Sequence, residues 1–192
     1  EAEYCLIESV TEPSQEQFEQ LIYKIFYSIK DFLEKTEKRL FSSSSFDYEE
    51  IEERIQRYDN FCRRVLAKKK IEMQHSEFLW NFLSLLVHGQ REVYHLHRYL
   101  DTHSVIFNDH SFFEALTQEF SLLMDAYFKS ELKPLEKIHA LEKKIISQEL
   151  YTSLQSRKID PVVLYHLGSS FRQFYLCTSP LMGIFLSSKS SK

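Results

Sequence analysis

Apolar residues recur every three or four positions along most of this chain. The clearest series follows Ser14 and Gln17, a capping-box pattern that marks the start of a helix. Steps of four and three residues then join Phe18, Ile22, Ile25, Ile29, Phe32 and Thr36. This heptad-like spacing predicts a helix over about residues 15–41 with one face toward a core, ending before the serine run at 42–45.

The same spacing marks two further helices that begin at capping boxes. Asp47 pairs with Glu50 in this pattern, and Ser111 pairs with Glu114. The two apolar stripes that follow are Tyr48, Ile51, Ile55, Tyr58, Cys62 and Val65, and then Phe113, Leu116, Phe120, Leu123 and Tyr127. Both stripes favour helices that bury one side and leave the other in solvent.

Three more segments complete the predicted helices. One spans 76–99, one begins at Lys133-Pro134, and one spans 161–177 from another proline. Proline suits the first helical position, where its missing N–H needs no partner. The segment 161–177 is apolar nearly all round in its first half, which is typical of a helix at the centre of a bundle or in an oligomer interface. Loops are expected near 42–46, 101–110, 129–133 and 156–160.

Composition favours the same architecture. The chain has only three glycines and four prolines, against 16 phenylalanines and 11 tyrosines. It therefore has few of the residues that form tight hairpin turns and many aromatic residues that long helices can bury in a core. We predict an all-α, single-domain antiparallel bundle of five to six helices over residues 14–186. A polar strap at 1–13 and a disordered Ser/Lys tail at 187–192 are expected to flank it.

Net charge and cysteine content limit the kinds of binding partner and the cellular compartment that we expect. A net charge of −4 argues against nucleic acid as the main partner, because phosphate binding needs a concentrated basic excess. No run of 18 apolar residues occurs, so no transmembrane segment is predicted. Cys5, Cys62 and Cys177 form no C-x-x-C pair, which favours a cytoplasmic or otherwise intracellular setting. A removed leader or secretion by a non-classical route stays open as an alternative.

Two E-x-x-H patterns lie on predicted helices, Glu92 to His95 and Glu136 to His139. This arrangement resembles the ferritin-like di-iron carboxylate proteins, whose two E-x-x-H motifs face the inside of a four-helix bundle. The resemblance implies a di-metal site on these four side chains. At about 100° per residue, however, His95 and Glu136 fall away from the apolar stripes, so we expect both in water and no bound cofactor.

Other polar residues offer further alternatives. Arg98 followed after four residues by His103 resembles the R-x4-6-H pattern of HEPN-type ribonucleases, and this implies Arg and His acting on an RNA backbone. His97, Glu142 and Glu149 fall on apolar stripes instead. They are either core groups with partners across the bundle or the lining of a polar cavity that holds a ligand or metal.

No motif for a nucleophile, a phosphate loop or a metal protease occurs, so we lean against an enzyme. We expect a non-catalytic interaction module, such as an adaptor, scaffold, chaperone or effector-like domain. Its contacts would come from surplus apolar surface near the C-terminus, by binding a partner protein or by self-association. The residues expected there are Val162, Val163, Leu167, Phe171, Phe174, Leu181, Ile184 and Phe185. A bundle with an aromatic-lined pocket for an apolar ligand is the alternative.

Overall fold

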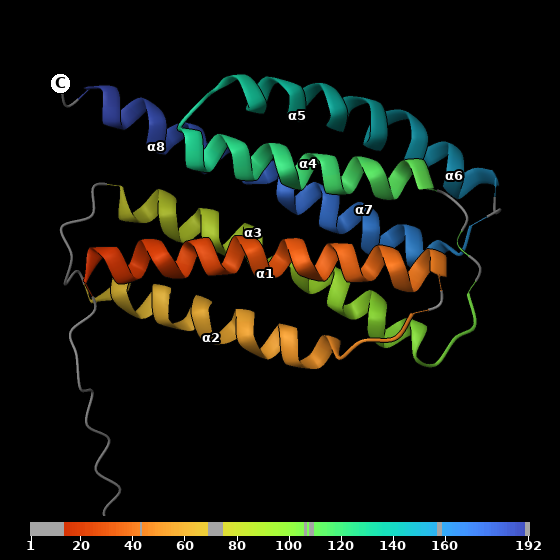
Figure 1. Ribbon diagram of the computed structural model, residues 1–192. Helices are drawn as coiled ribbons and strands as arrows, with labels where there is room; N and C mark the ends of the chain where they lie inside the picture. The colour runs from red at the N-terminus through yellow and green to blue at the C-terminus, as the bar shows by residue number, and fades with distance from the viewer. Residues whose placement is uncertain are drawn as a thin grey trace, which may run out of the picture.

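The computed structural model describes residues 14–42, 44–68, 75–105, 107, 110–156 and 159–190 (Figure 1). Every regular element in these ranges is a helix. In chain order they are α1 (Gln15–Ser42), α2 (Tyr48–Ala67), α3 (Ser76–Leu100), α4 (His110–Lys129), α5 (Lys133–Lys144), the π-helix η1 (Ile145–Leu150), α6 (Tyr151–Ser156), α7 (Pro161–Leu176) and α8 (Thr178–Ser190). The predicted all-α bundle is confirmed, while the expected strap at 1–13 lies outside the described residues.

The long helices alternate in direction. α1, α2 and α3 pack side by side, α4 and α5 form a second antiparallel pair, and α7 lies between the two groups (Figure 1). The most extensive helix–helix interface joins α3 and α7, and α7 also packs on α4, α5 and η1. α7 is therefore the central helix, which accounts for its apolar character all round.

The first helix forms as its sequence predicts. The Ser14 hydroxyl accepts from the Gln17 N–H at 3.2 Å, and the Gln17 side chain accepts from the Ser14 N–H at 3.1 Å, so the capping box is complete. Every member of the heptad-like series is fully buried: Phe18, Ile22, Ile25, Ile29, Phe32 and Thr36. The carboxylate of Asp47 likewise accepts from the Glu50 N–H at 2.9 Å at the start of α2.

Gly89 sets the distance between α3 and α7. A Cβ at this position would lie 2.5 Å from Cε1 and 2.6 Å from Cδ1 of Phe174. The missing side chain lets the Phe174 ring lie against the α3 backbone, where it is fully buried. The glycine interrupting the apolar stripe therefore marks a close helix crossing.

Two boundaries differ from the sequence expectations, whereas the helix beginning at Lys133 continues through η1 and α6 to Ser156, where a loop is expected. α4 begins at His110, so Ser111 lies inside its first turn and is not the N-cap. α8 begins at Thr178 and runs to Ser190, so the proline at 180 lies in a first helical turn and much of the expected disordered tail is helical.

Candidate docking groove

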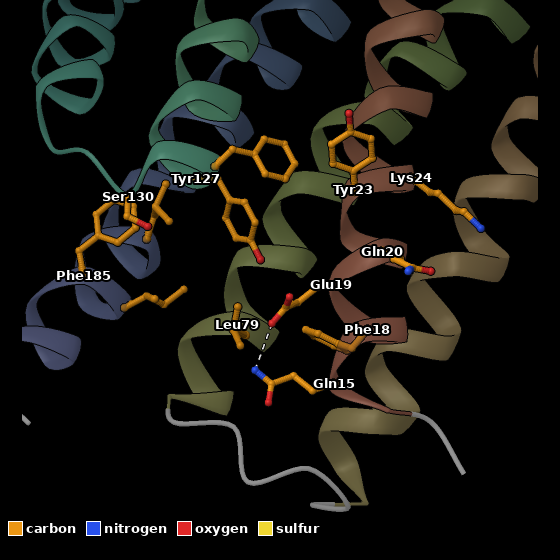
Figure 2. A pocket seen from close by; sticks show the side chains of 13 residues that line it. Gln15, Phe18, Glu19, Gln20, Tyr23, Lys24, Leu79, Tyr127, Ser130 and Phe185 are labelled. Carbon is orange, nitrogen blue, oxygen red and sulfur yellow. Dashed lines mark hydrogen bonds between the residues drawn. The ribbon is translucent and has the colours of Figure 1, made fainter. Parts of the chain in front are cut away.

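A broad groove opens at the end of the bundle where α1 begins (Figure 2). α1 forms one wall, the end of α4 and α8 form the other, and the start of α3 lies between them. Its volume is about 1120 Å³. The walls diverge because α8 packs on α3 and α7, which draws it away from α1.

The groove has an apolar interior. Phe18 and Leu181 are fully buried beneath it, and Leu79 and Phe185 are each 8% exposed. Tyr127 joins this interior to the core, since its ring stacks on Phe82 with centroids 5.3 Å apart. Burial raises the pKa of the Tyr127 hydroxyl well above its usual value, so this group stays neutral.

Two exposed aromatic rings line the opposite walls. Tyr23 on α1 is 49% exposed and Phe128 on α4 is 40% exposed, and their rings meet edge to face at 5.3 Å. Tyr23 also packs on the exposed Tyr27 at 4.3 Å, while Phe128 contacts the buried Phe26 at 5.2 Å. The aromatic core thus continues into a solvent-exposed ridge, and such rings dominate protein interfaces.

Polar side chains form the rim. Gln15 donates to the Glu19 carboxylate at 3.1 Å, drawn as a dashed line in Figure 2, and Lys24 and Ser130 also line the groove. Ser130 has a φ of 54° and ends α4 in the left-handed region, while the Glu131 N–H donates back to the Ala126 carbonyl. Together these groups form an apolar trough with a polar edge, suited to binding and without an arranged nucleophile.

The structure divides the apolar residues expected to form a C-terminal interaction surface. Leu181, Ile184 and Phe185 line the groove. The others belong to α7 and point into the bundle: Val163, Leu167, Phe171 and Phe174 are fully buried and Val162 is half-buried. The expectation of surplus apolar surface along α7 was therefore wrong, because α7 uses that surface as the central helix. Sequence reasoning missed Tyr23 and Phe128, whose exposure depends on where α1 and α4 diverge.

The candidate metal ligands are dispersed. His95 and Glu136 are exposed, as their helical faces predicted. The Glu92 carboxylate accepts from Nδ1 of His166 on α7 at 3.0 Å, and Nδ1 of His139 lies 3.0 Å from the Tyr175 hydroxyl. Across the described residues, no group of three or more His, Cys, Asp or Glu side chains could hold a metal ion.

The Arg98 and His103 pair lies at the opposite end of the bundle. Arg98 is on the exposed face of α3. The His103 ring stacks on the Tyr99 ring with centroids 4.1 Å apart, and its Nδ1–H donates to the Tyr99 carbonyl at 3.1 Å. The imidazole is therefore held against its own helix end, beside a small polar hollow of about 350 Å³.

His97 is a core histidine with partners on both ring nitrogens. Its Nε2 lies 2.8 Å from the Thr36 hydroxyl and its Nδ1 lies 3.0 Å from the Arg39 guanidinium, which also binds Asp101 at 2.5 Å. Tyr48 stacks on the imidazole at 5.2 Å. Burial, with the Arg39 charge second, lowers the pKa of His97 to about 3. These contacts of His97 link α1, α2 and α3 at the end of the bundle remote from the groove.

Two carboxyl groups are buried among α4, α5 and α7, those of Glu119 and Glu142. Glu142 binds Arg172 at 2.5 Å, whereas the half-buried Glu149 on η1 pairs with Lys144 at 3.1 Å. Glu119 is fully buried, and neither of its oxygens has a hydrogen-bond partner among the described residues. Burial, with the nearby Glu142 charge second, raises the pKa of Glu119 well above its usual value. The core therefore favours the protonated form of the Glu119 carboxyl group over the charged form.

Comparisons with known proteins add no relative. No protein-family profile matches the chain, and searches of curated proteins and of solved structures likewise find no match. Within the described ranges, no helix combines the length and apolarity needed to cross a membrane. The groove geometry is thus the most specific functional feature available.

Proposed function

We propose that this protein is a non-catalytic interaction module, and that its groove binds an amphipathic helix of a partner protein. The observation that carries the proposal is the pair of exposed rings, Tyr23 and Phe128, which contact each other and line an apolar trough. Helix-in-groove recognition uses this combination, with apolar anchors at i, i+3, i+4 and i+7 on the bound helix.

The size of the groove suits such a helix. An α-helix about 10 Å across occupies roughly 1200 Å³ over about ten residues, or 15 Å of length. The groove holds about 1120 Å³ and is open to solvent, so it accommodates one face of about three helical turns. A long acyl chain, at roughly 25–30 Å³ per methylene, fills less than half of that space, which favours a peptide over the apolar-ligand alternative.

The arrangement of polar and apolar groups supports the same choice. The buried floor of Phe18, Leu79 and Leu181 offers apolar contact, and the rim of Gln15, Glu19 and Lys24 offers hydrogen bonds at the edge. Protein interfaces combine an apolar centre with a polar rim in this way. Aromatic anchors at the centre of such a patch carry most of the binding free energy.

A displayed library of amphipathic helical peptides, selected against the full chain, provides the test. The affinity of the selected peptide is then measured by fluorescence anisotropy for four variants: Tyr23→Ala, Phe128→Ala, Tyr151→Ala and Tyr165→Ala. The last two are matched controls, because Tyr151 and Tyr165 are exposed by 58% and 61% but lie on α6 and α7, away from the groove.

We expect each groove substitution to weaken binding by about 30-fold, since an anchor at a hot spot contributes about 2 kcal/mol. The controls should change affinity less than threefold. Equal losses at Tyr151 and Tyr23 would refute the groove, as would selected peptides that ignore both groove variants. Competition by a fatty acid at lower concentration than any selected peptide would favour the apolar-ligand function instead.

A further inference from the structure

We propose that the hydroxyl group of Tyr127 selects the partner of the groove, because it requires a side-chain amide, from glutamine or asparagine, among the apolar anchors of the bound helix. The inference rests on the proposed function and deepens it, since it names the side chain that the groove recognises. Three features of the groove carry it: a ring that is fixed in place, a hydroxyl group without a partner, and a carboxylate beside that hydroxyl.

The ring of Tyr127 is fixed by the aromatic core. It stacks on Phe82 with centroids 5.3 Å apart and an angle of 15° between the two planes. It also packs on Phe26 with centroids 5.2 Å apart, and it meets Phe128 edge to face at 5.3 Å. A ring packed on several sides cannot turn away when a ligand enters, so its hydroxyl group is presented at one position.

The hydroxyl group of Tyr127 has no hydrogen-bond partner among the residues that the structure describes. Figure 2 shows this group at the tip of the ring, pointing into the trough between α1 and α8. Water hydrates a hydroxyl group in an open groove, whereas a helix that fills the trough removes that water. A buried hydroxyl group without a partner is costly, so a purely apolar ligand surface binds more weakly here than one that supplies a partner.

The missing partner has to accept a hydrogen bond. Burial is the main reason for the raised pKa of Tyr127, followed by the Cys62 thiol and the Glu19 carboxylate, so the proton stays on the hydroxyl oxygen at neutral pH. The pKa of Cys62 is itself raised to about 12, so this thiol is neutral. The hydroxyl proton therefore needs an oxygen atom on the ligand, from a carbonyl, a carboxylate or another hydroxyl group.

Glu19 is the charged group that acts on this hydroxyl. The two groups point toward one another in Figure 2. Lys24 also lines the groove, but its Nζ lies 5.8 Å from the centre of the Tyr58 ring on α2, and Figure 2 shows it directed away from Tyr127. Exposed groups of both signs lie further out at this end of the bundle: Glu16, Glu77 and Glu131, and Arg64, Lys68 and Lys133. The nearby Glu19 therefore decides which acceptor fits.

An amide suits both neighbours. Glu19 accepts from the Gln15 side-chain amide at 3.1 Å, and a carboxylate can accept from further donors. A glutamine or asparagine on the bound helix would accept from Tyr127 through its carbonyl and donate to Glu19 through its NH2 group. A carboxylate on the helix would also accept from Tyr127, but Glu19 would repel it.

The test starts from the helix selected for the groove. At each apolar anchor position, peptides with glutamine, methionine or glutamate are compared by fluorescence anisotropy. The three side chains are of similar length, but methionine lacks the amide and glutamate carries a charge. We expect one anchor position at which glutamine binds about tenfold more tightly than either alternative, because only glutamine pairs with both Tyr127 and Glu19.

Two variants of similar shape assign this preference to its source. Tyr127→Phe keeps the ring and removes the hydroxyl group, so methionine should bind at least as tightly as glutamine at that position. Glu19→Gln should reduce the preference for glutamine over glutamate to about threefold or less. Tyr165→Phe, which removes an exposed hydroxyl group outside the groove, is the matched control and should keep the full preference. Circular dichroism checks that each variant is folded.

The outcomes separate this inference from the proposed function. A preference for glutamine that survives Tyr127→Phe, or methionine binding best at every anchor position, would overturn the requirement for an amide. The docking groove would still stand if the helix depends on Tyr23 and Phe128. Glutamate bound as tightly as glutamine would overturn the choice of an amide over a carboxylate. If no selected helix depends on the two rings, the proposed function fails and the requirement for an amide fails with it.

Discussion

Replacing His97 with glutamine tests how the buried network at the far end of the bundle depends on pH. The Thr36 hydroxyl donates to the Phe32 carbonyl at 2.7 Å, so its oxygen accepts from His97 Nε2–H. The Arg39 guanidinium faces Nδ1 at 3.0 Å, and this nitrogen must accept. Burial disfavours the charged ring most, and a second proton on the ring would also point at the guanidinium, so the pKa of His97 falls to about 3.

The size of the effect follows from linkage. The unfolded histidine takes up its proton near pH 6.5, whereas the folded histidine stays neutral down to about pH 3. Between these values the unfolded state binds more protons, so stability falls as pH falls. At pH 5 this amounts to about 2 kcal/mol relative to pH 7, at 1.36 kcal/mol per pH unit. The other titratable or charged groups facing the ring are Arg39, Tyr48 and Asp101, from all three packed helices.

The assay is urea unfolding at pH 7, 6 and 5, followed by circular dichroism. The unsubstituted chain should lose about 2 kcal/mol more than His97→Gln between pH 7 and pH 5, because glutamine has no proton to take up. His88→Gln, at an exposed position of the same helix, is the matched control and should follow the unsubstituted chain. Parallel curves for all three proteins would refute the assignment of a buried neutral imidazole.

Two further substitutions test the core. Gly89→Ala should lower the free energy of unfolding by about 1–3 kcal/mol despite its better helix propensity, because its Cβ would overlap the Phe174 ring; Phe174→Leu should restore part of that loss in a double-mutant cycle by thermal unfolding, and simple additivity would contradict the contact. Glu119→Met should stabilise the fold by about 1–3 kcal/mol near pH 7, because it removes a buried carboxyl group without a partner. Since the raised pKa of Glu119 makes the folded state hold its proton longer, the unsubstituted chain should lose stability as pH rises above the ordinary glutamate pKa, and a Glu119→Met chain with the same pH dependence would contradict this.

Local patterns determined most of the helices. The capping boxes at Ser14 and Asp47 and the Asp160-Pro161 start all mark helix beginnings, because these signals act between residues three positions apart or fewer. The heptad-like stripe of α1 predicted its buried face for the same reason. Helical geometry also placed His95 and Glu136 in solvent without knowledge of any neighbouring helix.

The sequence was less informative at positions where a helix can either continue or end. A proline is common just after a helix end and equally acceptable in a first helical turn, and Pro180 lies in the first turn of α8. The π-helix at 145–150 has no signal in the residue pattern. Leu150 lies 3.0 Å from where a Cβ of Gly168 would be, so the close packing of η1 on α7 is set between helices. Packing between two helices cannot be predicted from residue patterns within one helix.

The tertiary structure alone decided the candidate site. An apolar stripe specifies that a face is covered, and it does not specify whether the same chain or a partner covers it. α7 was apolar enough to suggest an interface, and it became the central helix, with Leu167, Phe171 and Phe174 in the core. Tyr23 on α1 and Phe128 on α4 stay exposed because they line the groove at the end of the bundle, whose other wall includes α8. Helix propensity depends on neighbours in sequence, whereas a groove depends on the placement of helices far apart in sequence, and only the assembled bundle fixes that placement.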